Sequence, residues 1–156
     1  MTCRPILLCT FLILNLGTIV LAKERVVLTI NSDTVIASFS IKQLEALPHS
    51  TIKTVTHWTE GMQTFEGVLL STLVKNHQIK TNSLKAYALN NYSVDIPVSD
   101  LSKYPVLLAY KHNDNYIKIR NKGPLWVIYP LSDYPELNLP HINNRWIWQL
   151  KRIELK

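Results

Sequence analysis

Glycine is scarce in this chain, and its scarcity excludes two large classes of nucleotide enzyme. The 156 residues include four glycines, and one of them, Gly17, lies in an apolar N-terminal segment. Neither the G-x-G-x-x-G turn of dinucleotide-binding folds nor the G-x-x-x-x-G-K-S/T phosphate loop occurs. We therefore do not expect a Rossmann or P-loop enzyme.

Cysteine is absent after the first ten residues, which hold both Cys3 and Cys9. A chain that loses this segment has no disulfide, no thiolate nucleophile and no cysteine metal ligand. None of the five histidines forms an H-x-x-x-H or H-E-x-x-H pair, so no helical zinc site is encoded locally. The G-x-S-x-G elbow of serine hydrolases is also missing. No metal ligand set is predicted, although a site assembled from distant residues stays open.

The first 22 residues have the three parts of a secretory signal peptide. Arg4 gives a basic start, residues 5–21 are mainly apolar, and Val20 and Ala22 suit the small-residue positions before a cleavage site. We predict cleavage after Ala22 and a periplasmic or secreted domain over 23–156. A retained membrane anchor is the alternative, because the run is near the lower length for a spanning helix. No later apolar run exceeds seven residues, so we expect no transmembrane span after cleavage.

Basic residues exceed acidic ones, 17 to 11, and give a formal net charge of +6. Such an excess favours an anionic ligand, a membrane surface or nucleic acid, or is simply a basic solvated surface. The basic residues are scattered and form no run like a nucleic-acid-binding tail. Since an exported domain meets little nucleic acid, we expect no nucleic-acid partner.

The pattern of apolar residues predicts one α+β, β-rich domain with two or three short helices. Alternating, β-branched or continuously apolar residues mark the strands. A serine before an apolar run, or leucines four residues apart, marks each helix. The expected strands are 26–30, 34–37, 51–58, 84–89, 92–97, 106–110, 116–119, 125–129 and 145–155. The expected helices are 41–47 capped by Ser40, 68–74 closed by Asn76, and a turn from Ser99 to Lys103.

The loop Arg120-Asn121-Lys122-Gly123-Pro124 is the best ligand candidate in the sequence. It offers two cations, an amide, and a glycine whose backbone N–H can approach an anion closely. A tight turn between strands is the alternative. Trp126, just after the loop, could stack a planar ligand such as a pterin or a base, or pack in the core. Trp146 and Trp148 are expected to be core, because aromatic residues at strand spacing usually are.

Five segments, taken in order, resemble a known family. The chain is similar to the sulfite oxidase-like oxidoreductase molybdopterin-binding domain, and most of all to its short, exported, single-domain members. The resemblance covers about residues 65–155 and implies a mixed-sheet fold. The segments are TFEGVLLSTL (64–73), AYALNNYSVDIP (86–97), VLLAY (106–110), KGPLWVIYP (122–130) and WQLKRIEL (148–155).

The resemblance also implies a position for the molybdenum ligand, and this chain has other residues at that position. In catalytic members a cysteine thiolate, just before the Gly-Val-Leu helix, binds molybdenum carried by a pterin dithiolene. The matching stretch, 54–60, has no cysteine, and the position falls near Thr56 or His57. Threonine cannot supply a soft thiolate. Molybdopterin is thus the cofactor that the resemblance makes possible, whereas molybdenum is not expected.

A second family motif, His-Gly-x-Pro-x-Arg, is also altered. Lys122 stands for the His, the residue between Gly123 and Pro124 is missing, and Trp126 stands for the Arg. Lys122 can still meet a phosphate as a point charge, but the Trp cannot. Both departures predict the loss of molybdenum redox catalysis, while the fold survives because fold does not fix function.

The expected function is binding in the cleft that holds the pterin elsewhere in the family. We predict a non-catalytic or degenerate member that binds a small anionic or planar, pterin-like ligand, or a periplasmic or membrane protein partner. A molybdopterin-dependent oxidoreductase, with molybdenum held by the dithiolene alone or by His57, stays open. So does a structural or signalling module without a ligand. The expected site is Asn90 and Tyr92 for hydrogen bonding, Arg120, Lys122 and Gly123 for negative charge, Trp126 for stacking, and His57 at the cysteine position.

Overall fold

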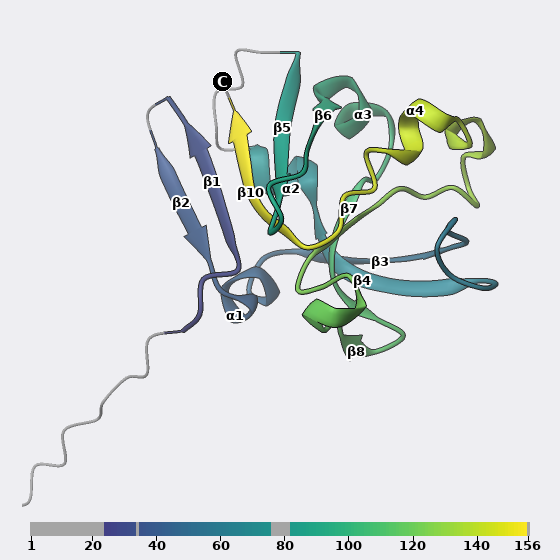
Figure 1. Ribbon diagram of the computed structural model, residues 1–156, viewed down its shortest axis with the longest axis horizontal. Helices are drawn as coiled ribbons and strands as arrows, with labels where there is room; N and C mark the ends of the chain where they lie inside the picture. The colour runs from purple at the N-terminus through teal and green to yellow at the C-terminus, as the bar shows by residue number, and fades with distance from the viewer. Residues whose placement is uncertain (1–23, 34, 76–81, 156) are drawn as a thin grey trace, which may run out of the picture.

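The computed structural model describes residues 24–33, 35–75 and 82–155 (Figure 1). The expected leader and its cleavage site lie outside these residues, and so do Thr34 and Asn76. Within the described part of the chain, no helix is long and apolar enough to cross a membrane. Ten strands in this part form two five-stranded sheets.

The first sheet is mixed and has the C-terminal strand at its centre. Its order is β2-β1-β10-β5-β6, with β10 parallel to β1 and antiparallel to β5. Ile153 and Leu155 of β10 are buried, whereas Arg152 and Glu154 alternate with them and lie on the outer face. The strands are β1 (Leu28–Ser32), β2 (Ile36–Phe39), β5 (Ser83–Ala88), β6 (Ser93–Pro97) and β10 (Leu150–Leu155).

The second sheet is antiparallel and lies across the first in Figure 1. Its order is β3-β4-β7-β8, and β9 pairs with β7. Residues 107–110 and all of β9 are buried, as continuous apolar runs predict. The strands are β3 (His49–Thr54), β4 (Gln63–Leu69), β7 (Leu107–His112), β8 (Asn115–Tyr116) and β9 (Trp126–Ile128). Side chains of both sheets form one hydrophobic core.

The first helix, α1 (Ile41–Glu45), begins where the sequence predicts. Ser40 and Gln43 form a capping box: the Ser40 hydroxyl accepts from the Gln43 N–H at 3.2 Å, and the Gln43 side chain accepts from the Ser40 N–H at 2.7 Å. Leu44 is fully buried and secures the helix to the core.

The other helices depart from the expectations. Residues 68 and 69 belong to β4, because Val68 pairs with Leu108 of β7, so the second helix begins only at Leu70. Pro97, not Ser99, is the N-cap of the third. A fourth, not predicted, brings the described α-helices to four rather than two or three. They are α2 (Leu70–Val74), α3 (Val98–Lys103) and α4 (Pro140–Asn143), with 3-10 turns η1 (Ile119–Asn121) and η2 (Pro135–Leu137).

The expected long strand over 145–155 is wrong in its first half. Residues 145–149 do not continue β10: Trp148 forms a single antiparallel bridge with Trp126 of β9, and Gln149 adopts φ +52°. Trp146 is buried, whereas Trp148 is 37% exposed. The reason is tertiary pairing. The Val127 N–H donates to the Ile147 carbonyl at 2.9 Å, and the Gln149 N–H donates to the Lys122 carbonyl at 2.9 Å. These bonds tie the segment to β9 of the second sheet and to the loop before it, instead of to a strand of the first sheet, which holds β10.

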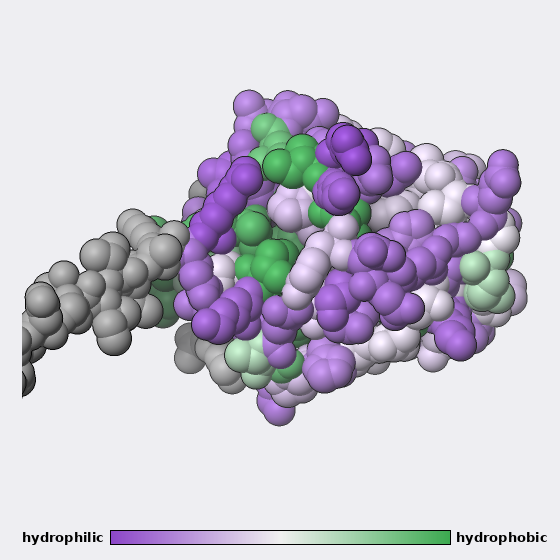
Figure 2. All heavy atoms as spheres, turned by 90° about the horizontal axis from the view of Figure 1, so that it is seen from below, coloured by the Kyte–Doolittle hydropathy of each residue, from purple (hydrophilic) through white to green (hydrophobic). Residues whose placement is uncertain are grey.

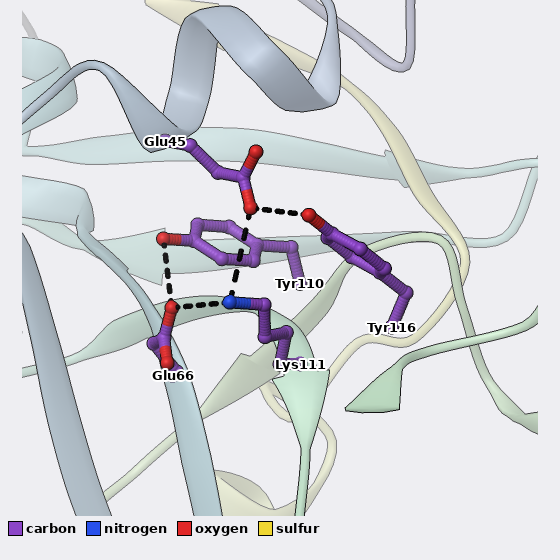
Figure 3. Close-up of polar contacts among 5 residues, drawn as sticks. All are labelled: Glu45, Glu66, Tyr110, Lys111 and Tyr116. Atoms are coloured by element: carbon purple, nitrogen blue, oxygen red, sulfur yellow. Dashed lines mark hydrogen bonds and ion pairs between the residues drawn. The ribbon is translucent and has the colours of Figure 1, made fainter. Parts of the chain in front are cut away.

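A polar cluster joins α1 to the second sheet (Figure 3). The Lys111 ammonium of β7 lies 2.9 Å from a Glu66 carboxylate oxygen on β4 and 3.8 Å from a Glu45 oxygen on α1. The Tyr116 hydroxyl of β8 donates to the same Glu45 oxygen. Tyr110 directs its hydroxyl toward Glu66. The hydrogen bond from Lys111 lowers the pKa of the Glu66 carboxyl below its ordinary value of 4.5.

We predict a pH-dependent contribution of Glu66 to stability. A carboxyl whose pKa is lowered on folding stabilises the native state above pH 4.5, and this contribution is lost as the pH falls through the folded-state pKa. Glu66→Gln should therefore lower the free energy of unfolding at pH 7 by at most about 1 kcal/mol. The difference between variant and wild type in urea unfolding should shrink steadily as the pH falls below 4.5. The control is Glu136→Gln on the exposed η2 turn, and a difference that does not change with pH contradicts the prediction.

Candidate functional site

A cavity of about 210 Å³ lies between the β5–β6 turn and the segment that follows α4. One part of its lining is aromatic and the other carries amides and a phenol. Such an apolar pocket with a few convergent polar groups is the usual form of a small-molecule site. The lining residues that matter here are Trp58, Trp146, Trp148, Asn90, Tyr92 and Asn143.

The aromatic wall is built around Trp58. Its ring lies 5.7 Å from Trp146, 5.6 Å from Trp148 and 6.3 Å from Trp126, between centroids. Trp126 and Trp146 are each 1% exposed, whereas Trp148 is 37% exposed. Of the four indoles, Trp148 therefore offers the most surface for stacking.

The polar rim comes from the tight turn between β5 and β6. Asn91 adopts φ +66°, as expected for the Asn-Asn turn, and the Asn90 side-chain oxygen accepts from the Tyr92 N–H at 3.0 Å. The exposed Tyr92 reaches across the pocket, with its hydroxyl 3.4 Å from the Asn144 carbonyl. The turn thus connects with the end of α4.

Two buried polar atoms of pocket-lining residues have no hydrogen-bond partner among the described residues. They are the Asn143 side-chain oxygen, an acceptor, and the Trp146 Nε1–H, a donor. Burying such a group without a partner costs about 1–3 kcal/mol. Because both residues line the pocket, a ligand that reaches these atoms with one donor and one acceptor would recover part of that cost.

One cation stands beside the aromatic wall. The Lys122 ammonium lies 5.4 Å from the Trp126 ring centroid and 6.0 Å from that of Trp148. Within the described ranges, no carboxylate pairs with it. Behind the wall His112 stacks on Phe65 at 4.7 Å, and burial, with the Lys122 charge, lowers the pKa of its imidazole. His112 is therefore neutral at pH 7, and Lys122 supplies the positive charge here.

A buried carboxylate holds the α4 side of the pocket in place. Asp100 of α3 is 7% exposed and accepts from the Arg145 guanidinium at 2.7 Å and from the Tyr129 hydroxyl at 2.9 Å. Burial and the Asp100 charge raise the pKa of Tyr129, so this hydroxyl stays protonated and donates. Arg145 lies directly between the amides at 143–144 and the tryptophans at 146 and 148.

The family model for the oxidoreductase molybdopterin binding domain matches residues 24–133. The chain belongs to this family. Both the predicted family and the predicted β-rich α+β fold are thereby confirmed. No curated protein sequence matches the chain.

A solved structure of the same fold is the sulfane dehydrogenase SoxCD from Paracoccus pantotrophus. It superposes with a TM-score of 0.60 at 18% sequence identity and covers 82% of this chain. At that identity the likeness shows the fold alone. This chain spans 37% of the SoxCD chain, little more than a third of its length.

The structure of this family member separates the expected site residues. Asn90 and Tyr92 line the pocket and Lys122 stands beside it. Arg120 is exposed on η1 and lines a different cavity, with Lys118 and Ile119. Arg120 and Lys122 thus stand at different cavities, and their binding of one ligand stays a prediction.

Two other residues of the expected site, Gly123 and Trp126, are engaged by the protein itself. The Gly123 N–H already donates to the Lys118 carbonyl at 2.9 Å, so it is not free for an anion. Glycine is needed there because a Cβ would lie 1.8 Å from the Ile117 carbonyl oxygen. Trp126 is buried and donates its Nε1–H to the Trp146 carbonyl at 3.2 Å, so its ring packs in the core rather than facing a ligand.

Sequence reasoning missed Asn143 and the exposed, pocket-lining position of Trp148. The strand predicted over 145–155 places Trp148 in the core. The Asn143-Asn144 pair just before Arg145 was the one local signal, since paired asparagines favour turns over strands.

The donors on this side of the molecule do not fit a molybdenum centre held by a protein ligand. The Thr56 hydroxyl is engaged by the Thr59 hydroxyl at 2.7 Å and by the Trp58 N–H at 3.1 Å. His57 is exposed and packs edge-on against Trp58. Residues 24–155 contain no cysteine, and the described residues hold no cluster of three potential metal ligands. A hydroxyl does not replace a soft thiolate.

We predict strong coupling between Arg145 and Asp100. Arg145→Met leaves a buried carboxylate with one partner and should lower the free energy of unfolding by about 3 kcal/mol. Asp100→Leu in the same chain should restore part of this loss, because the unpaired charge is gone. Urea unfolding followed by tryptophan fluorescence measures the double-mutant cycle. Additive effects of the two substitutions contradict the prediction.

Proposed function

We propose that this domain binds a small, planar, anionic ligand in the Trp58–Trp148 pocket and does not carry out molybdenum redox chemistry. It is then a degenerate member of its family, in which the cofactor cleft has become a binding site. The observation that carries the proposal is the pair of partnerless buried atoms, Asn143 Oδ1 and Trp146 Nε1, in the pocket lining.

The donor and acceptor support a flat heterocycle with an amide-like edge. Such an edge, as in a pterin or a pyrimidine, presents N–H and C=O groups side by side in one plane. It matches an acceptor from Asn143 and a donor from Trp146. Asn90, on the opposite turn, adds an exposed side-chain NH₂ for the outer edge of the ring.

The aromatic wall supports a planar ligand, and the Lys122 cation supports an anionic one. The half-exposed indole of Trp148 provides a face on which a flat ring can stack. Lys122, 6.0 Å from that ring and unpaired by any described carboxylate, favours a ligand with a negative group. A cavity of about 210 Å³ suits a single ring system rather than a large cofactor buried whole.

The absence of a thiolate supports the non-catalytic part of the proposal. The family's chemistry is molybdenum redox chemistry on a sulfur-ligated metal, and residues 54–60 offer a threonine and a histidine at that place. The Thr56 hydroxyl forms hydrogen bonds within the turn that positions Trp58. The segment thus builds the aromatic wall where the family would build a metal site.

The ligand proposal predicts binding of a defined probe, pterin-6-carboxylate, to the exported protein. Trp148→Ala should weaken binding about tenfold or more, because stacking on one aromatic ring contributes about 1–3 kcal/mol. Lys122→Met should weaken it by up to about fivefold, yet leave the affinity for neutral pterin unchanged. Calorimetric titration measures both, with Lys53→Met, an exposed lysine on β3, as the matched control.

Two outcomes overturn this proposal. One is a lack of binding by pterin-6-carboxylate and by neutral pterin to a folded wild type. The other is near-stoichiometric molybdenum, found by elemental mass spectrometry, in protein from a host that loads a control molybdoenzyme. The second would make the domain an oxidoreductase with an unusual ligand set.

We also propose that the domain acts in the periplasm or outside the cell, on the basis of its N-terminal 22 residues. Expression of the full chain should then yield an exported protein whose N-terminal residue is Lys23, as read by intact-mass measurement and N-terminal sequencing. Replacing Ala22 by a bulky residue, Ala22→Trp, should block this processing. Protein that keeps residues 1–22 in the membrane fraction would instead identify a retained anchor.

A further inference from the structure

A second region of the surface is a cationic groove, whose lining is basic and aliphatic rather than aromatic. Two adjoining cavities, of about 410 and 550 Å³, share Arg25, Val27 and Pro124 in their linings. Lys151 and Arg152 complete one, and the turn from Ile117 to Arg120 completes the other. We call this region the basic groove.

Every charged residue that lines the basic groove is basic. Arg152 is paired with Glu154 at 3.3 Å, and the Lys151 ammonium donates to the Asn91 side chain at 2.8 Å. By contrast, Arg25, Lys118 and Arg120 have no ion-pair partner in the part of the chain that the structure describes. Three unneutralised cations along one groove attract an anion.

The acidic residue nearest to Arg25 in the sequence does not neutralise it. The Glu24 carboxylate accepts from the Ser40 hydroxyl and lies 3.5 Å from the Lys42 ammonium. These contacts lower the pKa of Glu24, the Ser40 hydrogen bond most of all. Glu24 is thus held toward α1, and the charge of Arg25 in the groove is not neutralised by it.

The floor and edges of the groove are apolar. Val27, Ile117, Ile119 and Pro124 line its larger cavity, and Ile119 is 41% exposed. Val26 at the other cavity is 48% exposed. Seen from below, the molecule shows a hollow with hydrophobic atoms at its floor and hydrophilic residues around it (Figure 2). Exposed aliphatic groups inside a ring of cations suit a partner that is both anionic and apolar.

The covalent structure places this groove beside the membrane if the leader is inserted there. The apolar run ends at Leu21, and Arg25 follows four residues later. Four extended residues span at most about 14 Å, so Arg25 would lie close to the headgroup layer. This step rests on the leader proposed above, whereas the charges and the apolar floor do not depend on it.

We propose that the basic groove binds the anionic headgroups of a phospholipid membrane, with Ile119 and Val26 entering the interface between the headgroups. Cations near an anionic bilayer each strengthen binding by about 1 kcal/mol, which is about fivefold in affinity. Arg25, Lys118 and Arg120 together would hold the domain at the membrane after the leader is removed. The domain would then bind its planar ligand while it is attached to the membrane.

The test is flotation of the exported protein with vesicles of phosphatidylglycerol and phosphatidylcholine, against vesicles of phosphatidylcholine alone. Wild type should float with the anionic vesicles only. Lys118→Gln/Arg120→Gln should weaken this binding at least about tenfold. The matched control, Lys53→Gln/Lys103→Gln, removes the same charge from exposed positions outside the groove and should stay within about twofold of wild type.

Ile119→Ser separates headgroup attraction from entry into the interface. It should weaken binding to anionic vesicles by a similar factor at low and at high salt, because apolar contacts are not screened, whereas the loss in Lys118→Gln/Arg120→Gln should shrink at high salt. Unchanged midpoints of urea unfolding show that all groove variants are folded and keep this test separate from that of the pocket.

Three results would overturn the proposal. The first is equal binding to both kinds of vesicle. The second is an equal loss in the groove and control variants, which would reduce the effect to net charge. The third is a lack of binding to either kind of vesicle; capture of a synthetic acidic peptide would then make the occupant an acidic segment of a partner protein.

Discussion

The carboxylate of Asp100, buried between the Arg145 guanidinium and the Tyr129 hydroxyl, fixes the segment from which half of the pocket is built. A buried carboxylate is tolerated only with partners that donate to it, so Arg145 must stay where α3 and β9 put Asp100 and Tyr129. Because Arg145 stands between Asn143 and Trp146, the pocket amides and indoles are held as well. One ion pair thus connects the core of the fold to the geometry of the site.

Local signals in the sequence were sufficient wherever the structure obeys local rules. The Ser40 capping box, the Asn90-Asn91 turn and the buried β7 and β9 are each determined by residues within a few positions of one another. These features do not depend on which distant segment packs against them. Lys122 was selected as a cation of its glycine-containing loop, and its role in binding stays a prediction.

Several departures from the expectations occur where a distant segment decides the structure. Trp126 looked available for stacking, but its Nε1–H is taken by the Trp146 carbonyl, twenty residues away. Gly123 looked like an anion-binding amide, but the Ile117 carbonyl packs against its Cα and leaves no room for a side chain. Residues 145–149 have the composition of a strand, yet their backbone pairs with residues 122–127. No single-sequence pattern encodes such contacts, since periodicity reports only which face is buried.

The loop from Ile117 to Pro124 lies between the two proposed sites and serves both. Lys122 turns toward Trp148, whereas Lys118 and Arg120 line the groove. The loop is held by its own Gly123-to-Lys118 hydrogen bond and by Gln149, whose side chain donates to the Ile119 carbonyl and whose N–H donates to that of Lys122. A backbone fixed at both ends presents cations to two cavities at once. The β5–β6 turn also borders both sites, since Asn90 and Tyr92 line the pocket, while Asn91 lines the groove and accepts from the Lys151 ammonium. The two proposed sites are therefore neighbours that share two elements of the chain.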